Sequence, residues 1–192
     1  MINENRADYV KGWQEFRFLV GSKEAIAELT HAGHRLIICT NQACIACGLV
    51  SVATVEEIHR RMIAEIEQAG GHIEQVYYCP HSKDERCLCR KPRPGMLLRA
   101  RNELGVDLND ALFIGDSITD VRAGLAAGIP TVLVLTGLGE EQLRDHAHEA
   151  PGPFCIARDL THAAEIILQG VHVPYGNRLV SLRNEVILPS EV

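Results

Sequence analysis

Short, wholly apolar runs alternate with helical patterns along most of this chain. The clearest runs are residues 35–39 (RLIIC), 111–115 (ALFIG) and 131–135 (TVLVL), and residues 76–78 and 154–157 are weaker candidates. Strands that are apolar throughout and alternate with helices are typical of a parallel sheet covered on both faces. The pattern therefore predicts an α/β fold with a doubly wound parallel sheet.

Helical patterns fill the segments between these runs. Ser22 is expected to cap the first helix, and Thr54 with Glu57 to form a capping box that opens the second. Beyond residue 170 the pattern dissolves, so we expect one domain over 1–170 and a C-terminal tail over 171–192. The expected helices span residues 22–32, 54–69, 94–104, 119–127 and 159–169.

Composition excludes several classes of protein. With 46% apolar residues, the chain can bury a substantial core. A net charge of -6 argues against nucleic acid or an anionic membrane as its partner. The longest apolar stretch, residues 125–135, is short and interrupted by Gly128 and Pro130, and the first residues form no hydrophobic signal region. We therefore expect a soluble, cytoplasmic monomer that binds neither nucleic acid nor membrane.

Polar side chains follow two of the predicted strands, where a sheet of this kind binds its ligands. Thr40, Asn41 and Gln42 follow the first run, and Asp116 follows the run 111–115. A polar segment between these two runs supplies a pair of cations, Arg90 and Lys91. A hydroxyl, a carboxylate and fixed cations in one crevice suit a small phosphorylated ligand with Mg²⁺.

The same residues also have plainer structural interpretations. Asp120 is best interpreted as a carboxylate in the first turn of a helix, where it favours the helix dipole. Thr40 and Asn41 could satisfy backbone groups of a loop. Arg90 and Lys91 could be solvated charges. Taken singly these signals are weak, and their combination is what indicates a phosphate site.

A second cluster combines cysteine and histidine. Cys79 and His81 precede a five-residue polar stretch, and Cys87 and Cys89 follow it. Three thiols and one imidazole supply the four ligands of a closed, tetrahedral structural Zn²⁺ site. The intervening residues are too polar to bury, so a metal would hold this loop together. The alternative is a flexible loop with reduced cysteines that bind nothing.

The residues so far quoted resemble a known family. The run CPHSKDERCLCRKPRPGML at 79–97, TNQ at 40–42 and GDSITD at 115–120 are similar to the haloacid dehalogenase-like phosphatases. The resemblance is closest to the branch that contains heptose 1,7-bisphosphate 7-phosphatases and histidinol-phosphate phosphatases. It covers about residues 2–170 and implies a Rossmann-like fold and Mg²⁺-dependent hydrolysis of a phosphomonoester through an aspartyl-phosphate intermediate.

The resemblance also implies roles for individual residues. Thr40 matches the phosphate-stabilising threonine, Arg90 the substrate-recognition arginine and Lys91 the lysine that stabilises the phosphoryl group, all catalytic positions. Asp116 matches the acidic Mg²⁺ ligand. Asn41 and Gln42 match a substrate-contact stretch, and Cys79, His81, Cys87 and Cys89 match the zinc ligands.

The chain departs from that family at its most important motif. Relatives carry the nucleophilic and acid/base aspartates in a DxDGT-type motif that ends the first, central strand, and no such motif occurs here. Residues 2–17 resemble what normally follows it. A second departure is Cys47, where relatives commonly carry arginine. Without the central strand, 35–39 and 111–115 would face an empty slot and unpaired backbone groups, each costing about 1–3 kcal/mol. We expect the domain to unfold unless these strands close up or another segment fills the slot.

Two functional hypotheses follow. In the first, the chain is a sugar-phosphate phosphatase whose recorded sequence starts late, acting on D-glycero-D-manno-heptose 1,7-bisphosphate or, alternatively, on histidinol phosphate, and inactive as written. In the second, it is a catalytically dead module that binds a phosphorylated ligand or zinc. We prefer the first hypothesis because Thr40, Lys91 and Asp116 have little purely structural use on this fold.

Overall fold

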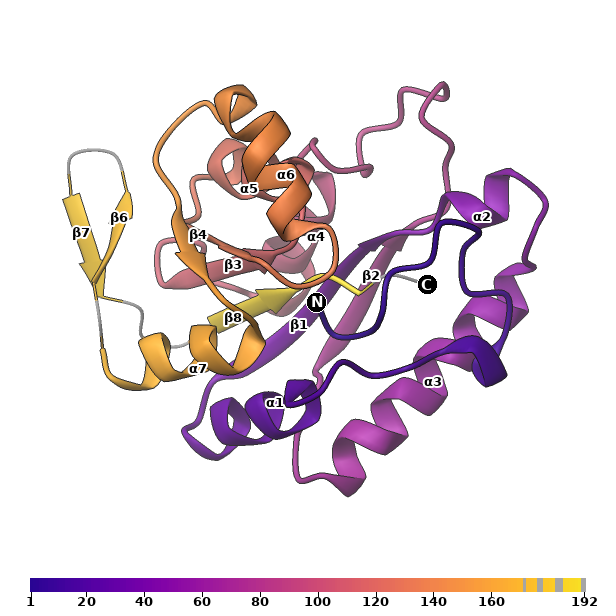
Figure 1. Cartoon of the computed structure of the whole chain (residues 1–192), viewed down its shortest axis with the longest axis horizontal. Helices are drawn as coiled ribbons and strands as arrows, with labels where there is room; N and C mark the ends of the chain where they lie inside the picture. The colour runs from indigo at the N-terminus through magenta and orange to yellow at the C-terminus, as the bar shows by residue number, and fades with distance from the viewer. Residues whose placement is uncertain (171, 176–177, 182–184, 191–192) are drawn as a thin grey trace.

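A six-stranded parallel sheet forms the centre of the molecule (Figure 1), which confirms the predicted α/β class. The computed structural model describes residues 1–170, 172–175, 178–181 and 185–190. An antiparallel pair, β6 (His172–Tyr175) with β7 (Arg178–Ser181), forms a separate two-stranded sheet. In spatial order the six strands are β2 (Gln75–Cys79), β1 (Arg35–Asn41), β8 (Glu185–Leu188), β3 (Ala111–Gly115), β4 (Thr131–Val134) and β5 (Cys155–Ala157).

The C-terminal segment supplies a central strand of this sheet. β8 pairs with β1 on one side, where Leu188 lies beside Ile38, and with β3 on the other, where Ile187 lies beside Phe113. From the sequence, the domain avoids unfolding either if β1 and β3 close up or if another segment fills the slot between them. The structure shows the second outcome. That segment comes from residues 171–192, where the sequence showed no clear pattern. Because β8 is paired on both sides, β1 and β3 keep their ladder partners.

Helices cover both faces of the sheet and enclose a core on each side. One core includes Val186 and Leu188 of β8, and the other includes Ile187, as the alternation of side chains along a strand requires. The first face is covered by α1 (Ser22–His31), α3 (Val52–Gln68) and α7 (Leu160–Leu168), and the second by α4 (Gly95–Leu104) and α5 (Ile118–Ala127).

Shorter elements connect this framework. They are the helices α2 (Ala43–Ala46) and α6 (Gly139–His146) and the 3-10 turns η1 (Trp13–Glu15) and η2 (Ala147–Glu149). Within the part of the chain that the structure describes, no helix combines the length and the apolar character needed to cross a bilayer.

Two of the expected helix caps are wrong, although the helices themselves are present. Gly21, not Ser22, precedes α1, and the Ser22 hydroxyl instead donates hydrogen bonds to the carbonyls of Ile2 (2.9 Å) and Leu19 (2.8 Å). Helix α3 is capped by Ser51, three residues before the expected Thr54, and the Ser51 hydroxyl accepts from the Thr54 amide at 3.1 Å. The bonds of Ser22 fasten the first residues of the chain to the start of α1.

The position of β8 in the core leads to a direct test. Ile187 is fully buried in β8, whereas Ile156 in the edge strand β5 is 46% exposed. Ile187→Ala should lower the free energy of unfolding by about 2–5 kcal/mol, the cost of a cavity in a packed core. The matched variant Ile156→Ala should lose less than about 1 kcal/mol, since surface substitutions usually cost little. Urea unfolding measures both values, and equal losses would contradict the central placement of β8.

Candidate active site

A polar crevice of about 540 Å³ opens beside the carboxyl ends of the strands. Asn41 at the end of β1, Ser117 after β3 and Leu138 after β4 all line it, which is where an α/β sheet of this kind binds ligands. Its charge is strongly positive although the chain as a whole is acidic. Asp120 is the one acidic residue among the lining residues, whereas the cations are Lys83, Arg86, Arg90, Lys91 and Arg93. Such a crevice attracts anions.

Lys91 is the most firmly held of these cations. Its side chain is only 4% exposed, and its Nζ lies 2.7 Å from Asp120 Oδ1 and donates a hydrogen bond to the Cys39 carbonyl at 2.9 Å. Asn41 fixes the Lys91 backbone from both sides, accepting from its amide at 3.0 Å and donating to its carbonyl at 3.2 Å. Lys91 is therefore a fixed, buried charge at the floor of the crevice.

Asp120 has the structural role that the sequence indicated and a second role as well. It forms a capping box with Ser117 at the start of α5, accepting from the Ser117 amide at 3.2 Å. Burial raises the pKa of Asp120, with the nearby Asp116 as a further cause, while the ion pair with Lys91 opposes both. Gly115 is required here, because a side chain at this position would collide with Asp120.

Thr40 and Asp116 lie beneath the crevice, fully buried. The Thr40 hydroxyl donates to the Ser190 carbonyl and accepts from Gln42 Nε2 at 3.0 Å. Asp116 Oδ2 lies 3.4 Å from the nitrogen of Met1. Its other oxygen, Oδ1, is buried without a hydrogen-bond partner among the described residues. A ligand that accepts from the Thr40 hydroxyl therefore has to displace the Ser190 carbonyl, and one that binds Asp116 Oδ2 has to displace the Met1 nitrogen.

The structure brings the predicted residues together at one end of the sheet. Asn41, Arg90 and Lys91 line the crevice, whereas Thr40, Gln42 and Asp116 are buried below it. Sequence reasoning missed Lys83, Arg86 and Arg93, although the charge of their loop was a usable signal. It also missed Ser190, because nothing in the sequence of the last residues indicated a strand.

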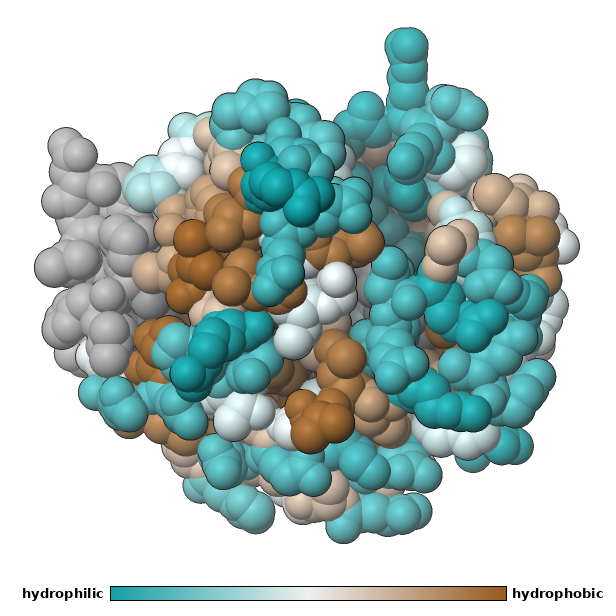
Figure 2. Space-filling view, viewed as in Figure 1, coloured by the Kyte–Doolittle hydropathy of each residue, from teal (hydrophilic) through white to brown (hydrophobic). Residues whose placement is uncertain are grey.

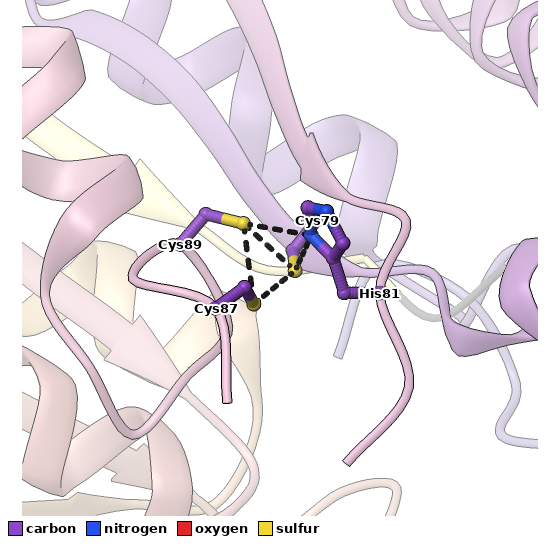
Figure 3. Close-up of side chains that lie close together, drawn as sticks. All are labelled: Cys79, His81, Cys87 and Cys89. Carbon is purple, nitrogen blue, oxygen red and sulfur yellow. Dashed lines mark hydrogen bonds between the residues drawn. The ribbon is translucent and has the colours of Figure 1, made fainter. Parts of the chain in front are cut away.

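The four zinc-ligand candidates face one another at the end of β2 (Figure 3). Their donor atoms all lie within 4.8 Å of each other, and Cys89 Sγ is 3.0 Å from Cys79 Sγ and 3.2 Å from His81 Nδ1. Burial raises the pKa of the Cys79 thiol, a shift that a bound metal reverses because it binds the thiolate. The donor set fits a tetrahedral metal ion with no position left open.

This metal-ligand cluster is joined to the crevice through its own loop. Arg90 follows Cys89 directly, and its guanidinium donates to the His81 carbonyl at 3.1 Å. The loop carrying these residues projects from the upper right of the molecule and is hydrophilic on the face shown in Figure 2. Because Arg90 follows Cys89 and bonds to His81, a metal ion that closes the cluster would also fix Arg90.

Comparison with known proteins gives a consistent result. The profile of the HAD-hydrolase-like family matches residues 88–163. The chain is 36% identical over 169 residues to D-glycero-beta-D-manno-heptose-1,7-bisphosphate 7-phosphatase of Neisseria meningitidis, covering 88% of this chain and 90% of that one. It is 39% identical over 169 residues to the enzyme of the same name from Pseudomonas aeruginosa, covering 88% and 93%.

Solved structures give the same picture. The D,D-heptose 1,7-bisphosphate phosphatase of B. bronchiseptica, complexed with magnesium and phosphate, superposes with a TM-score of 0.84 at 37% identity, covering 88% of this chain and 93% of that one. The enzyme of the same name from Burkholderia thailandensis superposes with a TM-score of 0.65 at 33% identity, covering 85% and 95%.

The buried pair of Lys91 and Asp120 leads to a prediction about stability. Lys91→Met leaves Asp120 buried without its cation and should destabilise the fold by about 3–5 kcal/mol. The double variant Lys91→Met/Asp120→Asn removes the stranded charge, keeps an acceptor for the α5 cap, and should recover much of the loss.

The deficit of Lys91→Met should also shrink as the pH falls from neutral to about 5. Folding raises the pKa of the stranded carboxyl, so the folded state takes up protons and gains stability on acidification. Thermal or urea unfolding measures each step. A single variant as stable as wild type at neutral pH would show that the pair does not hold the crevice floor.

Proposed function

This chain belongs to the haloacid dehalogenase-like phosphatases, in the branch of the heptose 1,7-bisphosphate 7-phosphatases, and on that premise we propose that its crevice binds a phosphorylated sugar. The preferred candidate is D-glycero-D-manno-heptose 1,7-bisphosphate, with the 7-phosphate as the group to be removed. Histidinol phosphate is the alternative within the same chemistry. The observation that carries this proposal is the set of cations lining a crevice at the strand ends, with Lys91 buried at its floor.

In this proposal each residue acts on the phosphate through an ordinary polar interaction. Lys91 supplies a fixed positive charge, and Arg90 can hold two phosphate oxygens with its planar fork of donors. Asn41 keeps Lys91 in place through the backbone. Thr40 and Gln42 form the layer below, and their contact with substrate stays a prediction.

Asp116 is the proposed Mg²⁺ ligand. Its unpartnered oxygen is a buried carboxylate acceptor, the donor type that Mg²⁺ prefers alongside phosphate oxygens and water. Such an ion would neutralise charge on the transferring phosphoryl group. The magnesium and phosphate in the B. bronchiseptica enzyme support this assignment.

Zn²⁺ is the proposed ion of the cluster formed by Cys79, His81, Cys87 and Cys89. We expect about one tightly held zinc per chain, because three thiols and an imidazole match a closed structural site. Elemental analysis of freshly purified protein measures it. Replacing Cys89 by Ser should lower both the zinc content and the melting temperature, whereas the exposed Cys47→Ser should change neither. Wild-type protein that contains no zinc would remove the assignment.

We expect no turnover from the 192-residue chain. The described residues that follow β8 are Pro189 and Ser190, and neither offers a carboxylate nucleophile. Assay with Mg²⁺ and heptose bisphosphate should therefore detect no phosphate release. Phosphate release that disappears in Asp116→Asn would contradict this expectation.

Restoring the missing motif tests the same prediction from the other direction. A chain extended at residue 1 by a strand ending in DxDGT, and ended at residue 170 so that β8 does not compete for the slot, should hydrolyse heptose bisphosphate. An extended chain that folds well yet remains inert on a broad panel of phosphomonoesters would favour the second hypothesis, a dead module that binds a phosphorylated ligand or zinc. That hypothesis draws support from the contacts that Met1 and Ser190 make with Asp116 and Thr40.

The expectations of a cytoplasmic monomer without membrane or nucleic-acid partners stay predictions.

A further inference from the structure

Ser190 stands beside Thr40 at the carboxyl end of the sheet. The ladder between β1 and β8 pairs Ile38 with Leu188, so the same register continued by two residues brings Thr40 next to Ser190. The hydrogen bond from the Thr40 hydroxyl to the Ser190 carbonyl shows that these two residues are in contact beyond the last ladder pair.

Asp116 lies on the other side of Ser190. The ladder between β3 and β8 pairs Phe113 with Ile187, and three residues further on Asp116 comes level with Ser190. Neighbouring strands of a sheet are about 4.8 Å apart. Ser190 is thus placed between the hydroxyl residue of β1 and the carboxylate residue that follows β3.

Continued past the ends of β3 and β8, the alternation of side chains assigns Ser190 and Asp116 to the same face of the sheet. Ile114 and Leu188 both pack in the core under α1, α3 and α7. Side chains alternate along a strand, so positions two residues further on return to that face. From this alternation we infer that the Ser190 hydroxyl and the Asp116 carboxylate occupy neighbouring positions on that face.

Both side chains carry a buried oxygen that no other described residue satisfies. Ser190 is 1% exposed and Asp116 fully buried. Neither Ser190 Oγ nor Asp116 Oδ1 has a hydrogen-bond partner in the described part of the chain, and they do not bond to each other. An unpartnered buried polar atom is rare in native proteins, and a bound ion is one of its physical explanations.

We propose that Ser190 is a ligand of the divalent cation held by Asp116, its hydroxyl oxygen and the Asp116 carboxylate supplying two protein ligands to Mg²⁺. This inference rests on the Mg²⁺ site of the proposed function and deepens it. Mg²⁺ accepts hard oxygen ligands, and a serine or threonine hydroxyl is a Mg²⁺ ligand in P-loop nucleotide sites. A divalent cation would satisfy both of these oxygens at once, in addition to the Met1 nitrogen that lies 3.4 Å from Asp116 Oδ2. Thr40 becomes the positioning residue that holds Ser190 through its carbonyl.

Metal binding by the full chain, with the cysteine site first filled with zinc, tests this role. The probe is Mn²⁺ as a stand-in for Mg²⁺, with free Mn²⁺ followed by electron paramagnetic resonance and Mg²⁺ added in competition. Ser190→Ala should weaken Mn²⁺ binding about tenfold, in the range found when groups supporting a metal site are removed. Its melting temperature without divalent cation should not fall, because the lost hydroxyl had no partner. Ser190→Thr should retain binding.

Thr131→Val is the matched control. Thr131 is also fully buried, and its hydroxyl donates to the Ile129 carbonyl at 3.1 Å, at the opposite end of β4 from the site. This variant should bind Mn²⁺ like wild type. Equal weakening in Thr131→Val and Ser190→Ala would overturn the proposal, since any lost buried hydroxyl would then have the same effect.

Asp116→Asn distinguishes the role of Ser190 from the existence of the Mg²⁺ site itself. Loss of Mn²⁺ binding in Asp116→Asn together with wild-type affinity in Ser190→Ala would overturn the role of Ser190 and leave the Mg²⁺ site of the proposed function standing. Wild-type affinity in both variants, or no Mn²⁺ binding by the wild-type chain, would overturn both.

Discussion

The pairing of β8 between β1 and β3 is the interaction on which the rest of the molecule depends. A parallel sheet is stable only when the backbone groups of its inner strands are paired and both of its faces are covered. β8 meets the first condition through ladders on both sides, and its Val186, Ile187 and Leu188 help meet the second. The same strand carries the chain to Ser190, beside Thr40, so one pairing serves both the core and the site.

Charge is distributed in two layers at the strand ends. The upper layer is the cationic crevice, whose arginines and lysines come largely from the loop that holds the cysteine and histidine cluster. The lower layer is buried: Lys91 balances Asp120 there, and one oxygen of Asp116 has no hydrogen-bond partner among the described residues. Buried charges are tolerated only when they are compensated. The buried carboxylates therefore limit the stability of the fold, and the unpartnered oxygen of Asp116 is where a bound cation is favourable.

Much of this arrangement was predictable from the sequence, because the signals were local. The apolar runs gave β1, β3 and β4, and the spacing of Cys79, His81, Cys87 and Cys89 matched a metal site. The strand-end positions of Asn41 and Asp116 followed from the topology. β8 was not predictable, because its four residues have no turn or helix signals beside them. They form a strand because β1 and β3 leave an unpaired position between them. Ser190 was missed with it. The caps of α1 and α3 were misplaced because the Ser22 hydroxyl bonds to backbone carbonyls outside the helix, and because Ser51 is the residue that reaches the Thr54 amide.

The rate of amide hydrogen exchange at residues 186–188, compared with the rate in β3 of the native protein, tests most directly whether β8 is a central strand. A strand paired on both sides inside the core opens only with the whole domain, so these amides should exchange as slowly as those of Leu112 and Phe113. Exchange at the rate of an exposed segment, with β3 still protected, would show that β8 does not occupy the centre of the sheet.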